Sequence, residues 1–493
     1  MEKLLQRVQE PQIDLRFSLL VLFILIFIAY LSQAVFQAFN ADDVIQAQYP
    51  SDALTFLAQG RWGYYFVYAK LQNALPAPVI STFVGACLLL ATAFLGAILL
   101  DFKRQYQLFF FAVIASISLY YGKVFSFDST RIAYPLGNLI AVWGLYAVIR
   151  GDRLLAMSGL LSLSMAPAFY PASTELAATL FMALFLVSLA TDFTYVSVQR
   201  LTLGAGALIA SLIFYLLITK GIYLLAGWHM GSRTDMDFLA IFSRYPEVAC
   251  LFTEHALPFL SNDRCATGQQ SHFERISLAI VVLSFNGIYL VRYWRRSQFA
   301  YMTLFLLGQI LLLLAPFILI FASKSSVFPD RSLYSIPYIY AFYLVMLLNE
   351  LLQYKRRAFN VAALLVMALG AGWVMKAMID ISNKSFGDYL DSQRNLHAVN
   401  RVISDIESVL AAEGRGADSY VPMVVINEKP RLGGAMHIPW SRERIYRLLD
   451  PRFDAAVDAE RARVLESLGD RPVWPAEGSV YVNQDTLVVI LSR

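Results

Sequence analysis

The sequence has few charged residues. Asp, Glu, Lys and Arg make up 15% of its 493 residues, while hydrophobic residues make up 58%. Soluble globular proteins carry about 25% charged residues. This composition excludes an ordinary soluble protein, and we expect most of the chain to lie in a lipid bilayer.

Several common functional motifs are missing as well. The chain has no Walker loop, no dinucleotide-binding fingerprint and no HExxH motif, so nucleotide chemistry has no support. His229, Asp235 and Asp237 offer ligand atoms, but their spacing matches no common metal site, and we expect no cofactor. Residues 17–37 lack the small-residue cleavage site of a signal peptide and predict a signal anchor that is retained.

Long apolar stretches are what the sequence has in abundance. About twenty apolar residues are needed to cross the roughly 30 Å of hydrocarbon in a bilayer. We therefore predict an α-helical polytopic membrane protein with about eleven transmembrane helices. The predicted spans are 17–37, 78–100, 106–122, 133–150, 154–170, 174–192, 201–226, 275–293, 299–322, 332–352 and 358–379.

The distribution of lysine and arginine predicts the orientation. Connections on the same side as the N-terminus hold compact basic clusters, such as RYWRR at 292–296 and YKRR at 354–357. The short loops on the other side hold few cations. Because basic loops stay in the cytoplasm, we expect the N-terminus inside and the C-terminus outside.

This topology divides the chain into two predicted domains. Residues 1–380 form the transmembrane domain, with outer loops at 38–77 and 227–273. Cys250 and Cys265 lie in the second loop and are expected to form a disulfide in an oxidising compartment; two free thiols are the alternative.

Residues 381–493 are predicted to form a small α/β domain outside the membrane. Residues 385–413 have helical periodicity. The predicted strands are 421–427, 478–483 and 486–491, and a helix is predicted over 446–468.

Two adjacent carboxylates, Asp42 and Asp43, follow the first span directly. One of them can cap the amphipathic helix expected from Val44. Neighbouring loop residues point in different directions, so the other is free to act as a general base on a sugar hydroxyl. Arg61 and Trp62 follow the same amphipathic segment, where an interfacial aromatic belt is the alternative interpretation.

Other ionisable residues gather on the outer side, where a charged group near lipid is a functional candidate. Lys123, Asp128 and Arg131 share a short outer loop, although Asp128 and Arg131 can also form a local ion pair. Asp330 and Arg331 precede a late span, and a forked guanidinium there suits a phosphate. Tyr170 and Glu175 lie in FYPASTE, where Glu175 is alternatively a first-turn acid of a helix.

These features resemble a known family. A cytoplasmic N-terminus, about eleven spans and an acidic pair opening the first outer loop are similar to membrane glycosyltransferases of the GT-C superfamily. ADD followed by GRW, with FDSTRIAYPLG and PDRSL later in the chain, resembles the bacterial glucosyl transferase II family. That family includes phage-encoded, serotype-converting O-antigen glucosyltransferases. The resemblance covers residues 1–380 loosely and 38–66 best.

The resemblance implies transfer of a sugar, typically glucose, from a polyprenyl-phosphate donor to a glycan such as lipopolysaccharide O-antigen. The reaction would take place at the periplasmic side of the bacterial inner membrane, with no nucleic-acid partner. It gives the role of catalytic base to Asp42 or Asp43. We expect Arg331, Arg61, Arg131 and Lys123 to bind the donor phosphate. The expected substrate-binding residues are Trp62, Asp128, Tyr170, Glu175 and Asp330.

Two alternatives remain at this stage. A transferase of pentose or aminosugar from the same kind of lipid would look similar in sequence. A transporter or flippase of lipid-linked sugars would also explain charges near the membrane, but paired repeats with broken spans, which transporters usually show, are absent from the sequence.

Overall fold

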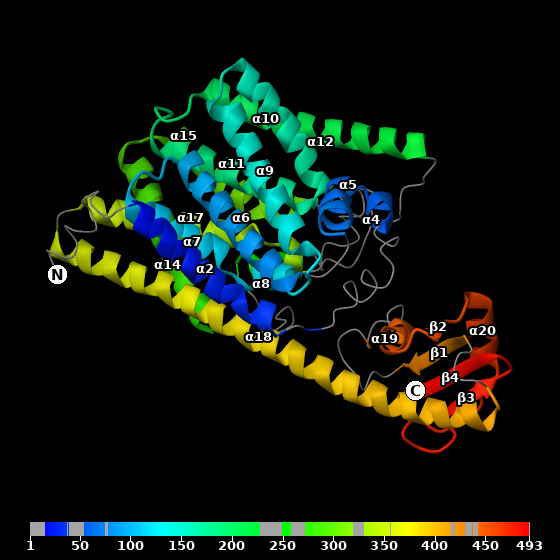
Figure 1. The fold of residues 1–493 in the computed structure, drawn as a ribbon. Coiled ribbons are helices and arrows are strands. Elements are labelled where there is room, and N and C mark those ends of the chain that lie inside the picture. Colours follow the sequence, from blue (N-terminus) through cyan, green and yellow to red (C-terminus); the bar gives the residue numbers. More distant parts are fainter. Residues whose placement is uncertain are drawn as a thin grey trace.

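The computed structural model of the chain is mainly helical (Figure 1). It describes residues 15–36, 38, 54–73, 77–226, 249–257, 272–318, 330–354, 356–415, 420–428, 436 and 442–492. The helices before the C-terminal region are α2 (Leu15–Val35), α4 (Leu54–Ala58), α5 (Trp62–Tyr65), η2 (Phe66–Leu71), α6 (Pro78–Leu99), α7 (Gln105–Ser116), α8 (Leu119–Phe125), α9 (Thr130–Arg150), α10 (Arg153–Met165), η3 (Ala166–Ala168), α11 (Ala172–Ala190), α12 (Val198–Ala226), α14 (His272–Arg295), α15 (Phe299–Leu314), η6 (Ala315–Phe317), η7 (Asp330–Ser332), α17 (Ile336–Gln353) and α18 (Arg357–Ala412).

A helix occupies each of the eleven predicted spans, but not all of these helices are long enough to cross a membrane. Among the described residues, nine helices are by themselves long and apolar enough to cross a membrane. The pair α7 and α8 is bent by 54°, and counts as a tenth span if the two are taken together. The helix over Arg153–Ala168 is shorter. The chain is therefore a polytopic helical membrane protein, and the described residues give nine or ten spans where about eleven were predicted.

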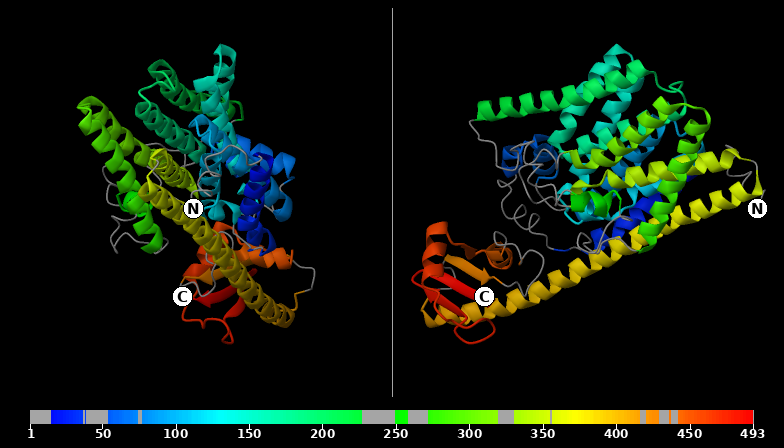
Figure 2. Two further views of the ribbon diagram at one scale, coloured as in Figure 1. Left: turned by 90° about the vertical axis from the view of Figure 1, so that its left-hand side faces the viewer. Right: turned by 180° about the vertical axis from the view of Figure 1, so that it is seen from behind.

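The helices form a bundle with two distinct ends. Helix α2 begins at one end, which we call the proximal end, while α4, α5 and the C-terminal sheet lie toward the other, the distal end (Figures 1 and 2). The chain alternates between the two ends, so that α6, α9, α11, α14 and α17 all begin at the distal end. Basic residues in the connections at the proximal end are Lys103, Arg104, Arg150, Arg153, Arg200, Arg292, Arg295, Arg296, Arg356 and Arg357.

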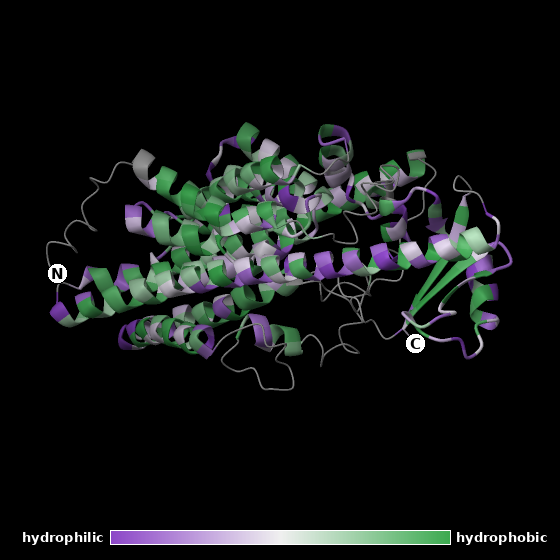
Figure 3. Ribbon diagram, turned by 60° about the horizontal axis from the view of Figure 1, so that its bottom comes forward, coloured by the Kyte–Doolittle hydropathy of each residue, from purple (hydrophilic) through white to green (hydrophobic). Residues whose placement is uncertain are grey.

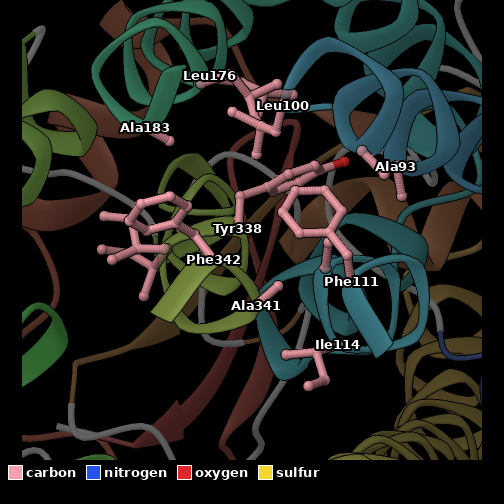
Figure 4. Close-up of a cluster of buried hydrophobic side chains, with 14 of the residues drawn as sticks. Ala93, Leu100, Phe111, Ile114, Leu176, Ala183, Tyr338, Ala341 and Phe342 are labelled. Carbon is pink, nitrogen blue, oxygen red and sulfur yellow. The ribbon is translucent and has the colours of Figure 1, made fainter. Parts of the chain in front are cut away.

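The core of the bundle is packed with aromatic and small side chains. In Figure 4, Tyr338 and Phe342 of α17 lie among Phe111 of α7, Leu100 and Ala183. The rings of Phe111 and Tyr338 meet edge to face, with centroids 5.9 Å apart. Helix α17 is the most buried of the nine spans found among the described residues, at 83%.

Helix α18 leaves the bundle and continues without a break to the C-terminal unit. It is 56 residues long, or about 84 Å at 1.5 Å per residue. Its first part passes along the bundle and its last part packs on the sheet, with more hydrophilic residues toward that end (Figure 3). The predicted domain boundary at residue 380 therefore falls inside one continuous helix.

The C-terminal unit is a four-stranded mixed sheet. Strands β1 (Val421–Asn427), β2 (Phe453–Ala455), β3 (Val480–Asn483) and β4 (Thr486–Ser492) lie in the order β2-β1-β4-β3, and only β3 and β4 are antiparallel. Val399, Val402 and Ile406 of α18 are buried against one face of the sheet. The predicted strands are confirmed.

The predicted helix over 446–468 is wrong. The chain instead forms α19 (Arg442–Leu449), strand β2 and α20 (Asp458–Glu466). Asp450 accepts hydrogen bonds from Arg452 at the turn after α19, and these bonds hold the pKa of the Asp450 carboxyl below its usual value. Pro451 lies inside this turn and interrupts the helical pattern.

Candidate functional site

The site predicted at the distal end begins with the short helices α4 and α5, which are fixed by a neighbouring span. Tyr223 of α12 donates hydrogen bonds to the carbonyls of Leu57 (3.0 Å) and Ala58 (2.9 Å). Tyr215 of α12 donates to the carbonyl of Gly60 at 3.2 Å. Hydrogen bonds to three carbonyls therefore fix the turn between α4 and α5. This turn fixes the position of the next residue, Arg61.

Gly60 allows this turn because its φ is +75°, a value that costs other residues about 1–2 kcal/mol. An added Cβ would lie 2.6 Å from the Tyr215 hydroxyl. We expect Gly60→Ala to displace Arg61 and to lower activity about tenfold, at unchanged membrane yield. The control is Gly221→Ala on α12, whose Cβ would meet nothing within 4 Å. Equal activity of both variants would contradict this role of the turn.

Arg61 lies over an aromatic side chain. Its guanidinium carbon is 5.1 Å from the centre of the Tyr170 ring, a distance at which a cation is attracted to the ring face. Tyr170 stacks on Tyr134 of α9 with centroids 3.8 Å apart, and lies 6.2 Å from Tyr334. Arg61 and Tyr170, which are 109 positions apart in sequence, therefore meet at the distal end of the bundle as the first members of one cluster.

Buried polar side chains next to these rings form a hydrogen-bond network. Ser173 of α11 donates to the Asn138 side-chain oxygen at 2.9 Å and lies 3.2 Å from the Tyr334 hydroxyl. Asn138 donates to the Tyr121 hydroxyl at 3.0 Å, and the Tyr121 and Tyr334 rings are stacked. We call the distal cluster the set Arg61, Tyr121, Tyr134, Asn138, Tyr170, Ser173, Glu175 and Tyr334.

Glu175 is the acidic member of the distal cluster. It lies in the first turn of α11, as the alternative interpretation expected, and is 2% exposed. It is close enough to Tyr334 to interact with it electrostatically. A carboxylate beside a network of hydroxyl groups is suited to hydrogen bonding with sugar hydroxyls.

Arg331 reaches the same end of the bundle from η7. Its guanidinium carbon is 4.4 Å from the centre of the Phe127 ring, and only two residues separate it from Tyr334 of the distal cluster. Its described ring contact is therefore with Phe127, whereas Arg61 contacts the Tyr170 ring of the distal cluster. The side chain of Asp330 lies outside the described set.

Asp128 and Arg131 form the local ion pair that the sequence left open. Their side chains are 3.1 Å apart and nearly buried, with exposures of 8% and 4%. Asp128 also accepts from Ser81 at 2.6 Å and from the backbone N–H of Ala77 at 2.9 Å. Arg131 donates to carbonyls of Phe125, Pro78 and Gln33. The pair joins the distal ends of α2, α6 and α8.

Lys123 is separated from the other predicted phosphate ligands. It lies on another face of α8, where it lines a cavity together with His255 and Tyr120. The ring nitrogen Nδ1 of His255 is 2.9 Å from the Tyr120 hydroxyl, and His255 is 2% exposed. The sequence analysis missed His255, and the pattern TEHALPF around it gives no signal that it is buried beside α8.

Trp62 begins α5 directly after Arg61. It is half-buried, and its indole nitrogen finds no hydrogen-bond acceptor among the described residues. Gly63 lies against Phe169 and Ala168, so the start of α5 rests on the connection between α10 and α11. Trp62 follows Arg61, which lies over Tyr170; the substrate-binding role of Trp62 and Tyr170 and the phosphate-binding role of Arg61 stay predictions.

Three predicted residues lie outside the described residues: Asp42, Asp43 and Cys265. Cys250 is disulfide-bonded, Cys87 is a free cysteine, and the pairing of Cys250 with Cys265 stays a prediction. In the part of the chain that the structure describes, no group of three or more His, Cys, Asp or Glu side chains could hold a metal ion. His229, Asp235 and Asp237 lie outside that part.

The fold and the site define a class of protein. It is a polytopic helical membrane protein whose distal cluster combines an arginine, aromatic rings and a buried carboxylate. A family model for the glucosyl transferase GtrII matches residues 31–348, and the chain belongs to this family. This membership indicates a glycosyltransferase. Searches of curated proteins and of solved structures gave no match.

Proposed function

We infer that this protein transfers glucose from a polyprenyl-phosphate donor to a cell-surface glycan, such as lipopolysaccharide O-antigen, with inversion at the anomeric carbon. The family gives the sugar and the reaction class. The observation that supports the rest is that Arg61 lies over the Tyr170 ring of the distal cluster, while Arg331, three positions before Tyr334 of that cluster, lies over the Phe127 ring. Two cations and a set of sugar-binding side chains at one membrane surface suit a sugar joined to a lipid phosphate.

The leaving group of this reaction is the lipid phosphate, which needs a cation. Negative charge grows on the phosphate oxygen as the bond to the anomeric carbon breaks, and a guanidinium stabilises it with two parallel hydrogen bonds. Arg61 and Arg331 are the residues we assign to this task. Arg131 is already engaged with Asp128 and three carbonyls, so we assign it to holding the loop that carries the base.

The nucleophile is a hydroxyl of the acceptor glycan. A hydroxyl is weakly nucleophilic at neutral pH, and a carboxylate that accepts its proton in the transition state makes it reactive. We assign this role to Asp42 or Asp43, nine and ten positions after Gln33, whose carbonyl accepts from Arg131 at 3.0 Å. Direct displacement by the activated hydroxyl gives inversion.

The distal end is the one we assign to the periplasm of a bacterial inner membrane. The basic residues of the proximal end favour the cytoplasm by the positive-inside rule. A site outside the cytoplasm meets no nucleotide sugars, so a lipid-borne donor is required. The C-terminal unit lies toward the same end of the bundle (Figure 1), and we assign it to holding the acceptor glycan.

The test is transfer by the purified protein in lipid vesicles. We expect mass spectrometry of the acceptor O-antigen to show added hexose when undecaprenyl-phosphate glucose is supplied. No hexose should be added when UDP-glucose replaces the lipid donor. Transfer from UDP-glucose alone would overturn the donor assignment. Movement of the glucosyl lipid across the vesicle membrane without any transfer would favour the transporter alternative.

A further inference from the structure

The span formed by α7 and α8 is broken where the two helices meet. Helix α7 begins at the proximal end and has 12 residues, or about 18 Å at 1.5 Å per residue. The break therefore lies inside the roughly 30 Å of hydrocarbon that a span crosses. Ile117 and Ser118 are extended there, and α8 leaves at 54° to α7. Backbone groups that lose their helical partners at this depth must be satisfied by the protein itself.

One side chain of α2 satisfies the backbone on both sides of this break. The hydroxyl of Tyr30 donates to the carbonyl of Ser116 at 2.6 Å and accepts from the backbone N–H of Ser118 at 3.3 Å. The ring of Tyr30 stacks on that of Phe125, near the end of α8, with centroids 4.4 Å apart. All four residues are buried. The position of α8 relative to α2 therefore depends on this hydroxyl and this ring.

A second residue of α2 holds α8 as well. Gln33 lies three positions after Tyr30, and its side chain donates to the carbonyl of Gly122 at 2.6 Å. The end of α2 thus lies beside α8 and contacts its backbone at two points (Figure 1). Because α2 ends at Val35, the same helix end leads within seven positions to Asp42, the first of the two candidates for the base.

Helix α8 brings Tyr121 into the distal cluster. The Tyr121 hydroxyl accepts from Asn138 at 3.0 Å, and its ring stacks on that of Tyr334 with centroids 5.3 Å apart. The N–H of Tyr121 donates to the Ser118 hydroxyl, which caps α8 directly after the break. A shift of α8 at the break therefore moves Tyr121 within the cluster.

We propose that Tyr30 is a positioning residue of the transfer reaction. By holding the break, it fixes α8, and with it Tyr121, relative to the helix end that leads to the base. Tyr30 itself acts through α8 and is not assigned a contact with substrate. This inference rests on the proposed function, and it adds a residue that neither the sequence motifs nor the phosphate assignment include.

The test compares Tyr30→Phe with Tyr343→Phe in the purified full-length protein. Tyr343 is as buried as Tyr30, and its hydroxyl donates to the side-chain oxygen of Gln309, a bond that joins α17 to α15 rather than α2 to the break. We expect Tyr30→Phe to lower kcat for hexose transfer about 10- to 100-fold, because misplacement by roughly 1 Å is enough for such a loss. The KM for undecaprenyl-phosphate glucose should change less than about threefold. Tyr343→Phe is expected to keep both constants near those of the wild type.

Two further measurements separate positioning from a general loss of stability. The double variant Tyr30→Phe, Tyr121→Phe should have a kcat within about threefold of the more impaired single variant, because both changes act on the same part of the cluster. Hydrogen exchange of the α8 backbone should be faster in Tyr30→Phe than in Tyr343→Phe, since the N–H of Ser118 loses its acceptor.

Wild-type kcat in Tyr30→Phe, equal losses in Tyr30→Phe and Tyr343→Phe, or losses that multiply in the double variant would overturn the proposal. Absence of hexose transfer by the wild type would overturn the proposed function instead. Hydrogen exchange of α8 needs no activity, so it tests the contact of Tyr30 with the break in either case and keeps the two failures apart.

Discussion

Replacement of the catalytic member of the Asp42–Asp43 pair by asparagine is expected to lower glucosyl transfer by about 10²–10⁴-fold, the usual contribution of a positioned general base. Asparagine has nearly the same size as aspartate but cannot accept the proton of the acceptor hydroxyl. The same change at the other aspartate is expected to leave most of the activity, because its role is limited to shaping the loop or capping a helix.

The physical reason for expecting two different results is the geometry of consecutive residues. Two neighbouring carboxylates on a loop point in different directions, so only one can reach the hydroxyl that attacks the anomeric carbon. An asparagine at a helix N-cap is as good a cap as aspartate. The capping residue therefore tolerates this substitution, whereas the base does not.

The measurement is added hexose on the acceptor glycan in cells and in vesicles, with each variant's amount in the membrane determined in parallel. Binding of undecaprenyl-phosphate glucose should be retained in both variants, since neither aspartate is assigned to the phosphate. Full activity of both variants would refute the assignment of the base to this pair, and Glu175 of the distal cluster would then be the carboxylate to replace next.

The positions of the spans could be predicted from the sequence because each one depends only on a run of apolar residues. The end of the last span could not. The hydropathy of α18 changes near residue 380, yet the helix continues, since no proline interrupts residues 357–412. Ion pairs one turn apart, Lys376 with Asp380 and Lys384 with Asp388, support the helix across the membrane surface. When α18 leaves the bundle, the pattern of apolar residues along it changes, but the backbone stays helical.

The error at 446–468 has a different cause. Strand β2 has three residues, and its place is set by parallel pairing of Phe453 with Val421 of β1. Such pairing depends on residues far apart in sequence and is not visible in local periodicity. Pro451 was the local sign, because the residue before a proline is disfavoured in a helix.

The candidate site was predictable where its partners are close in sequence. The pair of Asp128 and Arg131 is separated by three positions on a turn and was expected as one alternative. The contact of Tyr120 with His255 joins residues 135 positions apart and depends on how the segment 249–257 packs on the bundle. The sequence grouped Lys123 with Arg61 and Arg331, but in the structure Lys123 lines a cavity with Tyr120 and His255, whereas Arg61 lies over Tyr170 and Arg331 over Phe127.

The buried pair of Asp128 and Arg131 leads to the largest expected effect on stability. We expect Arg131→Met to lower the free energy of unfolding by about 3–5 kcal/mol, the usual cost of removing one partner of a buried ion pair. Methionine fills similar space but leaves the Asp128 carboxylate, 8% exposed, with no guanidinium beside it. The carbonyls of Phe125, Pro78 and Gln33 lose their donor as well.

Unfolding of the purified protein in mild detergent with increasing denaturant measures this effect, and membrane yield provides a second readout. The matched control is Lys384→Met, which removes an ion pair whose side chains are 34% and 33% exposed and is expected to cost less than about 1 kcal/mol. The double variant Asp128→Asn, Arg131→Met should recover part of the loss, because it removes the stranded charge. If Arg131→Met is no more destabilising than the control and yet abolishes donor binding, Arg131 belongs with Arg61 and Arg331 as a phosphate ligand. Because a structural role changes unfolding and a ligand role changes donor affinity, the two measurements together assign this arginine.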